Sequence, residues 1–430
     1  MSVETTPTTS PTPTTSPTLT PETTTERPFI GATAIVAPSG DAAIRPFEFH
    51  ASDEALADLR RRIEATRWPE RETVGDGTQG VQLELMQKLA DYWATGYDWR
   101  RCEAQLNALP NFMTEIDGLD IHFIHVRSKH ENALPVIITH GWPGSPIEQL
   151  KIIGPLTDPT SFGGKADDAF DVVIPSMAGY GFSGKPTEPG WDPSRMARAW
   201  AVLMQRLGYT RYVAQGGDWG AFVTEQMAVQ TPSGLLAIHV NLPSAAPPEI
   251  LQALPSHQPP PGISDDERRA FERIDFLLTK GLAGFQEMAS RPQTLYAIED
   301  SPVGLAAWFL DHDKRSYEMI SRAFDGVAEG LTRDDVLDNL TLTWLTRTAV
   351  SGARLYWENK QPFFVPFGVK LPVAVSTFPD EVYECPRSWA EQAYPNLILF
   401  NRHPKGGHFA AWEQPQAIID DLRTAFRSLR

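Results

Sequence analysis

The stretch Val213-Ala214-Gln215-Gly216-Gly217-Asp218-Trp219-Gly220 decides the fold. An apolar run ends here in Gly-x-Asp-x-Gly, which has the spacing of the Gly-x-Ser-x-Gly turn between a strand and a helix. Such a turn exposes the side chain of its central residue beside backbone N–H donors. We therefore predict that Asp218 is displayed as a nucleophile where a sheet strand ends.

Aspartate at the centre of this turn suits a different electrophile from serine. A serine attacks an acyl carbon, whereas a carboxylate can displace a leaving group at an sp³ carbon. The second reaction leaves an ester between enzyme and substrate, and water can open that ester at the enzyme's own carbonyl. We therefore expect the electrophile to be a strained or activated sp³ carbon, as in an epoxide or an alkyl halide.

Short apolar runs on both sides of this stretch each end in a polar or glycine-rich loop. They alternate with helical segments, which is typical of a parallel sheet covered on both faces. The predicted strands are 134–139, 170–174, 211–214, 235–240, 371–376 and 396–400, preceded by a hairpin over 112–126. We predict an α/β fold with a mostly parallel central sheet flanked by helices, and with its chemistry at the carboxyl ends of the strands.

The 430 residues allow one large domain with additional segments. A Thr/Pro/Ser-rich start has almost nothing to bury and is expected to be disordered. A proline-rich and then helical interval interrupts the strand pattern, as an inserted lid would. The predicted segments are a tail over 1–28, a helical N-terminal extension over 29–115, the first part of the core over 116–245, a helical lid over 246–360, and the second part of the core over 361–430.

The composition limits the partners. The net charge of −16 disfavours binding to nucleic acid or to an anionic membrane surface. No run of 18 apolar residues and no signal peptide are evident in the sequence. Cys102 and Cys385 are the two cysteines and show neither a disulfide framework nor a metal-site spacing. We expect a cytoplasmic protein with reduced thiols, no metal and no cofactor; a homodimer is compatible with the sequence.

A nucleophile on such a turn needs a base to activate water and an acid to orient that base. In this architecture they follow in the order nucleophile, acid, histidine. His408, preceded by Gly406-Gly407, is the expected base because an imidazole titrates near neutrality. Two adjacent carboxylates, Asp380 and Glu381, are equal candidates for the acid.

The developing oxyanion needs N–H donors, and the leaving oxygen needs a proton. We expect the backbone N–H groups of Trp219 and Trp142 to form the oxyanion hole. The Trp142 loop also carries His140, which we interpret as a residue that shapes the turn. A phenol in the lid is a suitable proton donor, and three lid tyrosines are candidates: Tyr296, Tyr317 and Tyr356.

With these residues, the chain resembles the microsomal-type epoxide hydrolases of the α/β-hydrolase superfamily. The matching strings cover roughly residues 45–430: HGWPGS (140–145), AGYGFS (178–183), GGDWG (216–220), DSPVGLAAW (300–308), ARLYWEN (353–359), FPDE (378–381) and GGHFAAWEQP (406–415). The resemblance implies Asp218 as nucleophile and His408 as base. It also implies Glu381 as the acid and Tyr356 as the proton donor.

One position departs from the family pattern. A second lid tyrosine is expected in a Gly-Tyr pair, and the matching place is Gly284-Phe285. Phe285 cannot donate a proton. Either Tyr356 acts alone, or a neighbour such as Tyr296 or Tyr317 takes over, or the substrate needs less acid assistance.

The sequence therefore predicts an epoxide hydrolase that needs no cofactor and forms a vicinal diol from a hydrophobic or aromatic epoxide. Two alternatives stay open. A haloalkane dehalogenase would share the Asp nucleophile, and a catalytically silent binding protein would keep the fold. The natural substrate, and whether the enzyme serves detoxification or biosynthesis, stay open as well.

Overall fold

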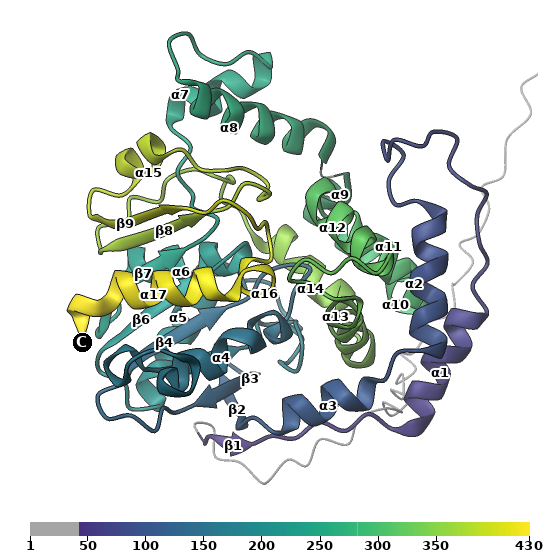
Figure 1. Cartoon of the computed structure of the whole chain (residues 1–430), viewed down its shortest axis with the longest axis horizontal. Helices are drawn as coiled ribbons and strands as arrows, with labels where there is room; N and C mark the ends of the chain where they lie inside the picture. The colour runs from purple at the N-terminus through teal and green to yellow at the C-terminus, as the bar shows by residue number, and fades with distance from the viewer. Residues whose placement is uncertain (1–42, 282) are drawn as a thin grey trace, which may run out of the picture.

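A nine-stranded sheet forms the centre of the protein (Figure 1). The computed structural model describes residues 43–281 and 283–430, so the predicted tail over 1–28 lies outside the described residues. The strands are ordered β1-β2-β3-β5-β4-β6-β7-β8-β9. Their bounds are β1 Arg45–Pro46, β2 Asn111–Ile116, β3 Leu119–Val126, β4 Leu134–Thr139, β5 Phe170–Pro175, β6 Tyr212–Gly216, β7 Leu235–Val240, β8 Val373–Thr377 and β9 Leu397–Arg402.

The larger part of the sheet is parallel. Strand β4 pairs in parallel with β5 and β6, and parallel pairing continues through β7, β8 and β9. The pairs β1–β2, β2–β3 and β3–β5 are antiparallel. Asp117 and Gly118 make the turn between β2 and β3, with φ of 53° and 78°, as a tight hairpin turn requires. The predicted fold class and the hairpin are confirmed.

Helices cover both faces of the sheet, as expected for apolar strands (Figure 1). Helices α4 and α17 pack on one face, where Ile152, Leu156 and Leu422 join the apolar side chains of β4 and β5. Helices α5 and α6 pack on the other, where Trp200 is fully buried. The bounds are α4 Leu150–Thr157, α5 Pro193–Arg206, α6 Trp219–Gln230, α15 Arg387–Ala393, α16 Ala410–Glu413 and α17 Pro415–Phe426.

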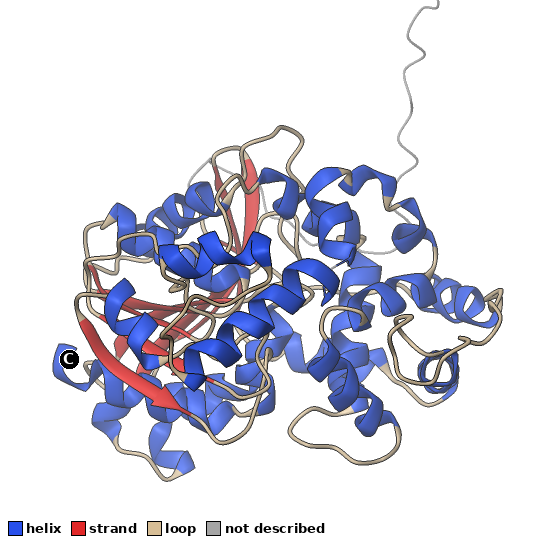
Figure 2. Ribbon diagram, turned by 90° about the horizontal axis from the view of Figure 1, so that it is seen from above, coloured by secondary structure: helices blue, strands red, loops and turns tan. Residues whose placement is uncertain are grey.

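The segment between β7 and β8 is helical and extends beyond one end of the strands (Figures 1 and 2). Its helices are α7 Pro248–Ala253, α8 Asp265–Phe276, α9 Ala283–Ser290, α10 Tyr296–Asp300, α11 Pro302–Leu310, α12 Lys314–Phe324, α13 Arg333–Thr346 and α14 Ala349–Glu358. Ser301 caps α11 by accepting from Gly304 N, and Pro302 occupies its first turn. We call the segment from α7 to α14 the lid.

Three N-terminal helices pack against the lid from outside: α1 Asp53–Glu64, α2 Leu83–Thr95 and α3 Trp99–Asn107. Asp338 on α13 accepts hydrogen bonds from Tyr97 Oη at 2.7 Å and from Arg101 Nη2 at 2.6 Å. Trp93 Nε1 donates to Thr341 Oγ1 at 2.9 Å. The described part of the predicted extension over 29–115 also includes β1 and most of β2, the first strand of the predicted hairpin, at the edge of the sheet. The extension therefore ties the lid to the core.

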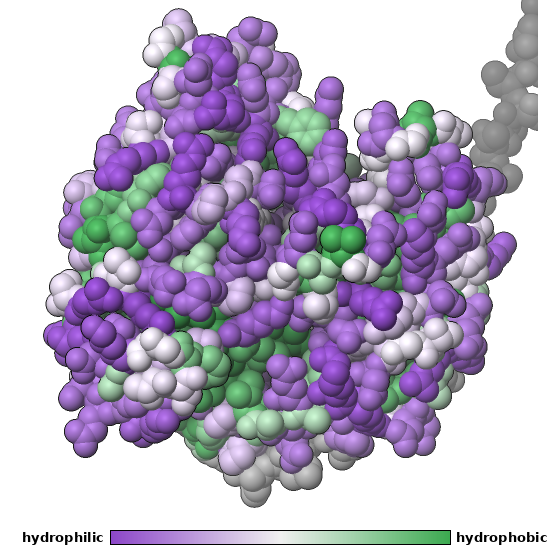
Figure 3. Space-filling view, in the orientation of Figure 1, coloured by the Kyte–Doolittle hydropathy of each residue, from purple (hydrophilic) through white to green (hydrophobic). Residues whose placement is uncertain are grey.

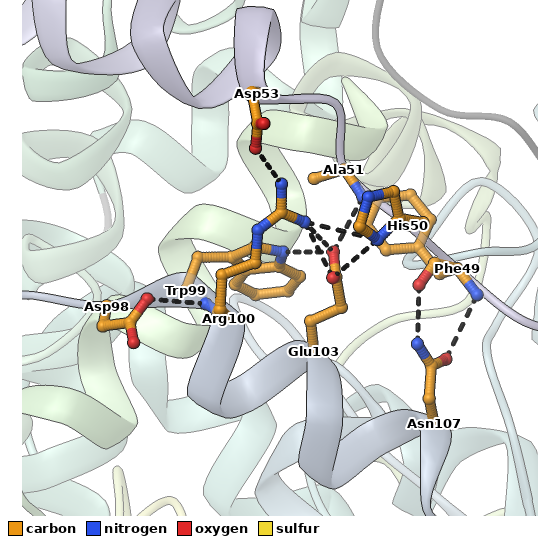
Figure 4. Close-up of polar contacts among 9 residues, drawn as sticks. All are labelled: Phe49, His50, Ala51, Asp53, Asp98, Trp99, Arg100, Glu103 and Asn107. Carbon is orange, nitrogen blue, oxygen red and sulfur yellow. Dashed lines mark hydrogen bonds and ion pairs between the residues drawn. The ribbon is translucent and has the colours of Figure 1, made fainter.

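A buried carboxylate on α3 holds the start of the described chain in place (Figure 4). Glu103 accepts from the backbone N–H of Ala51 at 2.7 Å, from Trp99 Nε1 at 3.1 Å and from Arg100 Nη1 at 2.8 Å. Burial opposes the charge of Glu103, but these donors outweigh it and lower the pKa of the carboxyl. The network fixes the segment before α1 against α3.

The face seen in Figure 3 is largely hydrophilic, with smaller apolar patches between charged side chains. Within the described residues, no helix is both long enough and apolar enough to cross a membrane. Cys102 and Cys385 are both buried and free.

Candidate active site

The turn between β6 and α6 has a strained backbone at Asp218, the residue predicted to be the nucleophile. Asp218 lies between them with φ of 50° and ψ of −128°, a conformation that costs a non-glycine residue energy and is typical of functional turns. Two glycines allow the backbone to pack closely at this turn. A Cβ on Gly216 would lie 2.1 Å from Gly220 O, and one on Gly220 would lie 2.0 Å from Thr139 O. Glycine is required at both positions.

Asp218, His408 and Glu381 come together although they are far apart in the chain. His408 Nε2 lies 3.6 Å from Asp218 Oδ2, and His408 Nδ1 lies 2.7 Å from Glu381 Oε1. Both partners of this last contact are almost completely buried. The neighbouring Asp380 is half-exposed and faces Arg315 instead. Glu381, rather than Asp380, therefore contacts the imidazole.

The electrostatics of this triad depend on the charge of Asp218. Burial opposes a charge on His408, but Glu381, Asp218 and Asp313 outweigh it and raise the pKa of the imidazole well above its ordinary value. Loss of the Asp218 charge would remove one of these contributions. The pKa of His408 is therefore sensitive to any change in the charge of Asp218.

The loop after β4 supplies a donor to the Asp218 carboxylate. Trp142 N–H donates to Asp218 Oδ1 at 2.7 Å. A Cβ added at Gly141 would lie 2.4 Å from that oxygen, so only glycine fits at this position. His140 Nε2 accepts from Met177 N at 3.1 Å, and burial lowers its pKa to about 4. His140 therefore holds the loop as a neutral residue. Trp219 begins α6 directly after Asp218, with its side chain buried.

Of the three lid tyrosines, only Tyr356 lies at the site. Its ring is buried, with its centroid 4.8 Å from that of Trp219 and 6.1 Å from that of Trp142. Burial and the nearby Asp218 carboxylate raise the pKa of Tyr356 well above its ordinary value, so the phenol keeps its proton. Tyr296 is 68% exposed. The hydroxyl of Tyr317 accepts from Gln82 N in the extension.

A mostly apolar cavity of about 40 Å³ opens in front of Asp218, between the core and the lid. Phe285 lines it and packs edge-on against Tyr356, with ring centroids 5.0 Å apart. The position that lacks the second tyrosine therefore faces the site. Besides Asp218, His408, Tyr356 and Phe285, the lining residues are Trp219, Phe222, Leu242, Leu277, His312, Phe363, Phe364 and Val382. We call this space the front cavity.

A second, polar cavity of about 20 Å³ lies against Asp218 and His408. Its lining includes Glu148, Gln149 and Gln215, and we call it the back cavity. Glu148 Oε1 accepts from Gly141 N at 3.1 Å. Burial raises the pKa of Glu148 to about 8, which keeps this carboxyl largely neutral. A polar space of this volume is large enough for a water molecule.

Two of these residues are not identified by sequence reasoning. Glu148 lies shortly after the HGWPGS string in the sequence. Only its burial in the folded protein, beside Gly141, distinguishes it from a surface carboxylate. His312 lies between α11 and α12 in a sequence, Asp-His-Asp, that has no motif spacing. The fold alone brings it to the front cavity.

Comparisons with known proteins agree with this architecture. Residues 44–149 match the family model described as epoxide hydrolase N terminus, and residues 135–278 match the alpha/beta hydrolase fold. A putative epoxide hydrolase of Stigmatella aurantiaca is 51% identical over 391 residues, covering 90% of this chain and 86% of the relative. Epoxide hydrolase 1 of Oryctolagus cuniculus is 34% identical, covering 89% of this chain and 88% of the relative.

Solved structures give the same result. Juvenile hormone epoxide hydrolase from the silkworm Bombyx mori superposes with a TM-score of 0.79 at 30% identity, covering 90% of this chain and 96% of the other. Aspergillus niger epoxide hydrolase superposes with a TM-score of 0.77 at 29% identity, covering 93% and 100%. The chain therefore belongs to the microsomal-type epoxide hydrolase family of the α/β-hydrolase superfamily.

Proposed function

We propose that this epoxide hydrolase works through a covalent ester on Asp218 and acts on a hydrophobic epoxide. The observation that carries the proposal is the pair of contacts made by one carboxylate. Asp218 Oδ1 is bound by Trp142 N–H, while Oδ2 faces His408, which is bound in turn to Glu381. The apolar and aromatic lining of the front cavity supports a hydrophobic substrate.

In the first step, Oδ2 of Asp218 attacks an oxirane carbon and the carbon–oxygen bond of the ring breaks. Oδ1 stays at the Trp142 N–H as the carbonyl oxygen of the ester. The leaving oxygen takes the phenolic proton of Tyr356. Among the described residues that line the front cavity, Tyr356 is the one phenol, so this step depends on a single lid donor.

In the second step, water attacks the Asp218 carbonyl carbon and His408 accepts its proton. Esterification removes the negative charge of Asp218, which lowers the pKa of His408 and makes the imidazole available as a base. Glu381 stabilises the imidazolium that forms. The N–H groups of Trp142 and Trp219 hold the tetrahedral oxyanion. When it collapses, the departing diol oxygen takes the proton from His408, and the proton left on the Asp218 carboxyl restores the phenol of Tyr356, so the vicinal diol is released and the enzyme returns to its starting state.

The back cavity is the place from which we expect the water to attack. It touches both the carboxylate that becomes the ester and the base that activates water. The substrate occupies the front cavity during this step, so a separate polar space allows ester and water to be present together. The neutral Glu148 carboxyl would orient the water without adding a charge.

A variant that stops the second step tests the proposal. In His408→Gln, the ester is expected to form and persist, so intact-mass analysis after mixing with a styrene-type epoxide shows the enzyme plus one substrate mass. Asp218→Asn shows no addition. Absence of the adduct in His408→Gln, with diol still released by the wild type, contradicts the covalent route. Halide release from bromoalkanes at a rate comparable to diol formation would favour a dehalogenase instead.

We also propose a cytoplasmic location, supported by the two buried free thiols, which are typical of a reducing compartment. Fractionation of cells that express the chain tests this, and recovery with the membrane fraction contradicts it.

A further inference from the structure

The front cavity is lined by His312, whose imidazole belongs to a second imidazole–carboxylate pair that the proposed reaction does not use. His312 Nδ1 lies 2.9 Å from Asp313 Oδ2, and both side chains are buried. The other oxygen of Asp313 accepts from the N–H groups of Arg315 and Ser316 at the start of α12. The carboxylate is thereby fixed, and it in turn fixes the His312 ring.

This pair repeats the arrangement of Glu381 and His408. In each pair a carboxylate occupies Nδ1, which leaves Nε2 as the free nitrogen. The two imidazole rings lie against each other, with centroids 4.3 Å apart and planes inclined at 39°. Both rings border the cavity in front of Asp218.

The spacing of the three side chains is suited to a metal ion. One ligand atom each from Asp218, His312 and His408 lies within 4.8 Å of the others. Ligands of tetrahedral Zn²⁺ at about 2.0–2.1 Å from the metal lie roughly 3.4 Å apart. The separation of 3.6 Å between His408 Nε2 and Asp218 Oδ2 is already close to that value. Bringing in the third ligand needs a shift of about 1.4 Å at most.

The ligand chemistry points to the same class of ion. Two imidazoles and one carboxylate suit Zn²⁺ and neighbouring first-row metals rather than Mg²⁺ or Ca²⁺. A histidine ligand usually donates its other N–H to a carboxylate, and both histidines have that partner here. Three protein ligands next to a cavity leave a fourth position for water.

We propose that Asp218, His312 and His408 form a binding site for a divalent transition-metal ion such as Zn²⁺, and that its occupation inhibits the enzyme. Inhibition follows because the ion takes the lone pairs of Asp218 and of His408 Nε2. The first is needed for attack on the epoxide and the second for activation of water. The inhibitory part rests on the proposed function, whereas binding of the metal does not.

Co²⁺ is the probe for the site, because its visible absorption is intense when four-coordinate and weak when octahedral. We expect the EDTA-treated full-length chain to bind one Co²⁺ with the four-coordinate spectrum, and Zn²⁺ to displace it. Zn²⁺ affinity is then measured by calorimetry without substrate, so a failure of the proposed reaction does not affect this result. An octahedral Co²⁺ spectrum overturns the proposal.

Variants identify the ligands. His312→Gln is expected to weaken Zn²⁺ binding by more than about tenfold, and Asp313→Asn by about ten- to a hundredfold through its effect on His312. Asparagine also caps helices, so Asp313→Asn keeps the start of α12 and serves if His312→Gln fails to fold. The matched control is His257→Gln, which changes an exposed histidine that is also paired with a carboxylate, Asp275.

Unchanged Zn²⁺ affinity in both site variants, or an equal loss in His257→Gln, overturns the site. The activity arm compares Zn²⁺ inhibition constants for epoxide hydrolysis, each relative to the metal-free rate of the same variant. We expect Zn²⁺ to compete with substrate, and His312→Gln to raise the inhibition constant as much as it weakens binding. Binding at this site without inhibition overturns the inhibitory part and contradicts the roles of Asp218 and His408.

Discussion

Replacing Tyr356 with phenylalanine removes the proposed proton donor and little else. The phenylalanine ring can keep the edge-on contacts of Tyr356 with Trp219 and Phe285, at centroid distances of 4.8 and 5.0 Å. Phe285 stands where a second tyrosine would be, so no other phenol among the described lining residues can compensate. Loss of one donor to a developing oxyanion in a site closed to water costs about 2.7–4 kcal/mol. We therefore expect the alkylation rate to fall by about 10²- to 10³-fold.

The assay must separate the two chemical steps. Rapid mixing of excess enzyme with epoxide, followed by acid quench and intact-mass analysis, measures ester formation; decay of the ester measures hydrolysis. Tyr356→Phe is expected to slow only the first step. The double variant Tyr356→Phe/Phe285→Tyr places a hydroxyl on the neighbouring ring and is expected to recover about tenfold or more of the loss, as one charge-assisted hydrogen bond would. An alkylation rate within about threefold of wild type in Tyr356→Phe, less than a lost donor allows, would refute the assignment.

Three further variants test other parts of the structure. Glu381→Gln is expected to slow ester hydrolysis by about 10²- to 10⁴-fold, which is measured as accumulation of the ester. The control Asp380→Asn, at the neighbouring position, is expected to leave the hydrolysis rate near that of the wild type. Equal effects of the two substitutions would contradict the pairing of Glu381 with His408. Gly220→Ala places a Cβ 2.0 Å from Thr139 O and is expected to lower the free energy of unfolding by about 1–3 kcal/mol, measured by urea denaturation. The control is Gly75→Ala, because a Cβ there meets no atom within 4 Å. Because the pKa of Glu148 is raised to about 8 in the folded protein, its contribution to stability is full below the unfolded pKa of about 4.5 and is lost as pH rises towards 8. Glu148→Gln should therefore gain up to roughly 1.4 kcal/mol per pH unit relative to wild type between these values; a difference in unfolding free energy that does not change between pH 5.5 and pH 8 would show that Glu148 is not held neutral.

The parallel part of the sheet could be predicted because its strands are almost continuously hydrophobic. Runs such as 134–139 and 235–240 are buried on both faces, so they read as continuous apolar segments between polar loops. The edge of the sheet was harder. Strand β1 is only two residues long, too short for its sequence pattern to be recognised, whereas β2 was recognised as the first strand of the hairpin over 112–126.

Within the site, local pattern identified Asp218 and His408 but left Asp380 and Glu381 equivalent. Their difference lies in burial, since one is half-exposed and the other is enclosed beside His408. His312 and Glu148 could not be found from sequence, because each becomes distinctive only when the chain brings it next to Asp218. The lid tyrosines show the same limit: local pattern left Tyr296, Tyr317 and Tyr356 equivalent, and only the family resemblance singled out Tyr356. In the structure Tyr296 is exposed and the Tyr317 hydroxyl contacts Gln82 in the extension.

The covalent role of Asp218 is tested most directly by a single turnover in ¹⁸O-labelled water with enzyme in excess. The account predicts that the hydrolytic oxygen enters the Asp218 carboxylate, so the peptide that contains Asp218 gains label and the diol from that turnover does not. Label in the diol and none in Asp218 would mean that water attacks the epoxide directly. That result would contradict the ester mechanism.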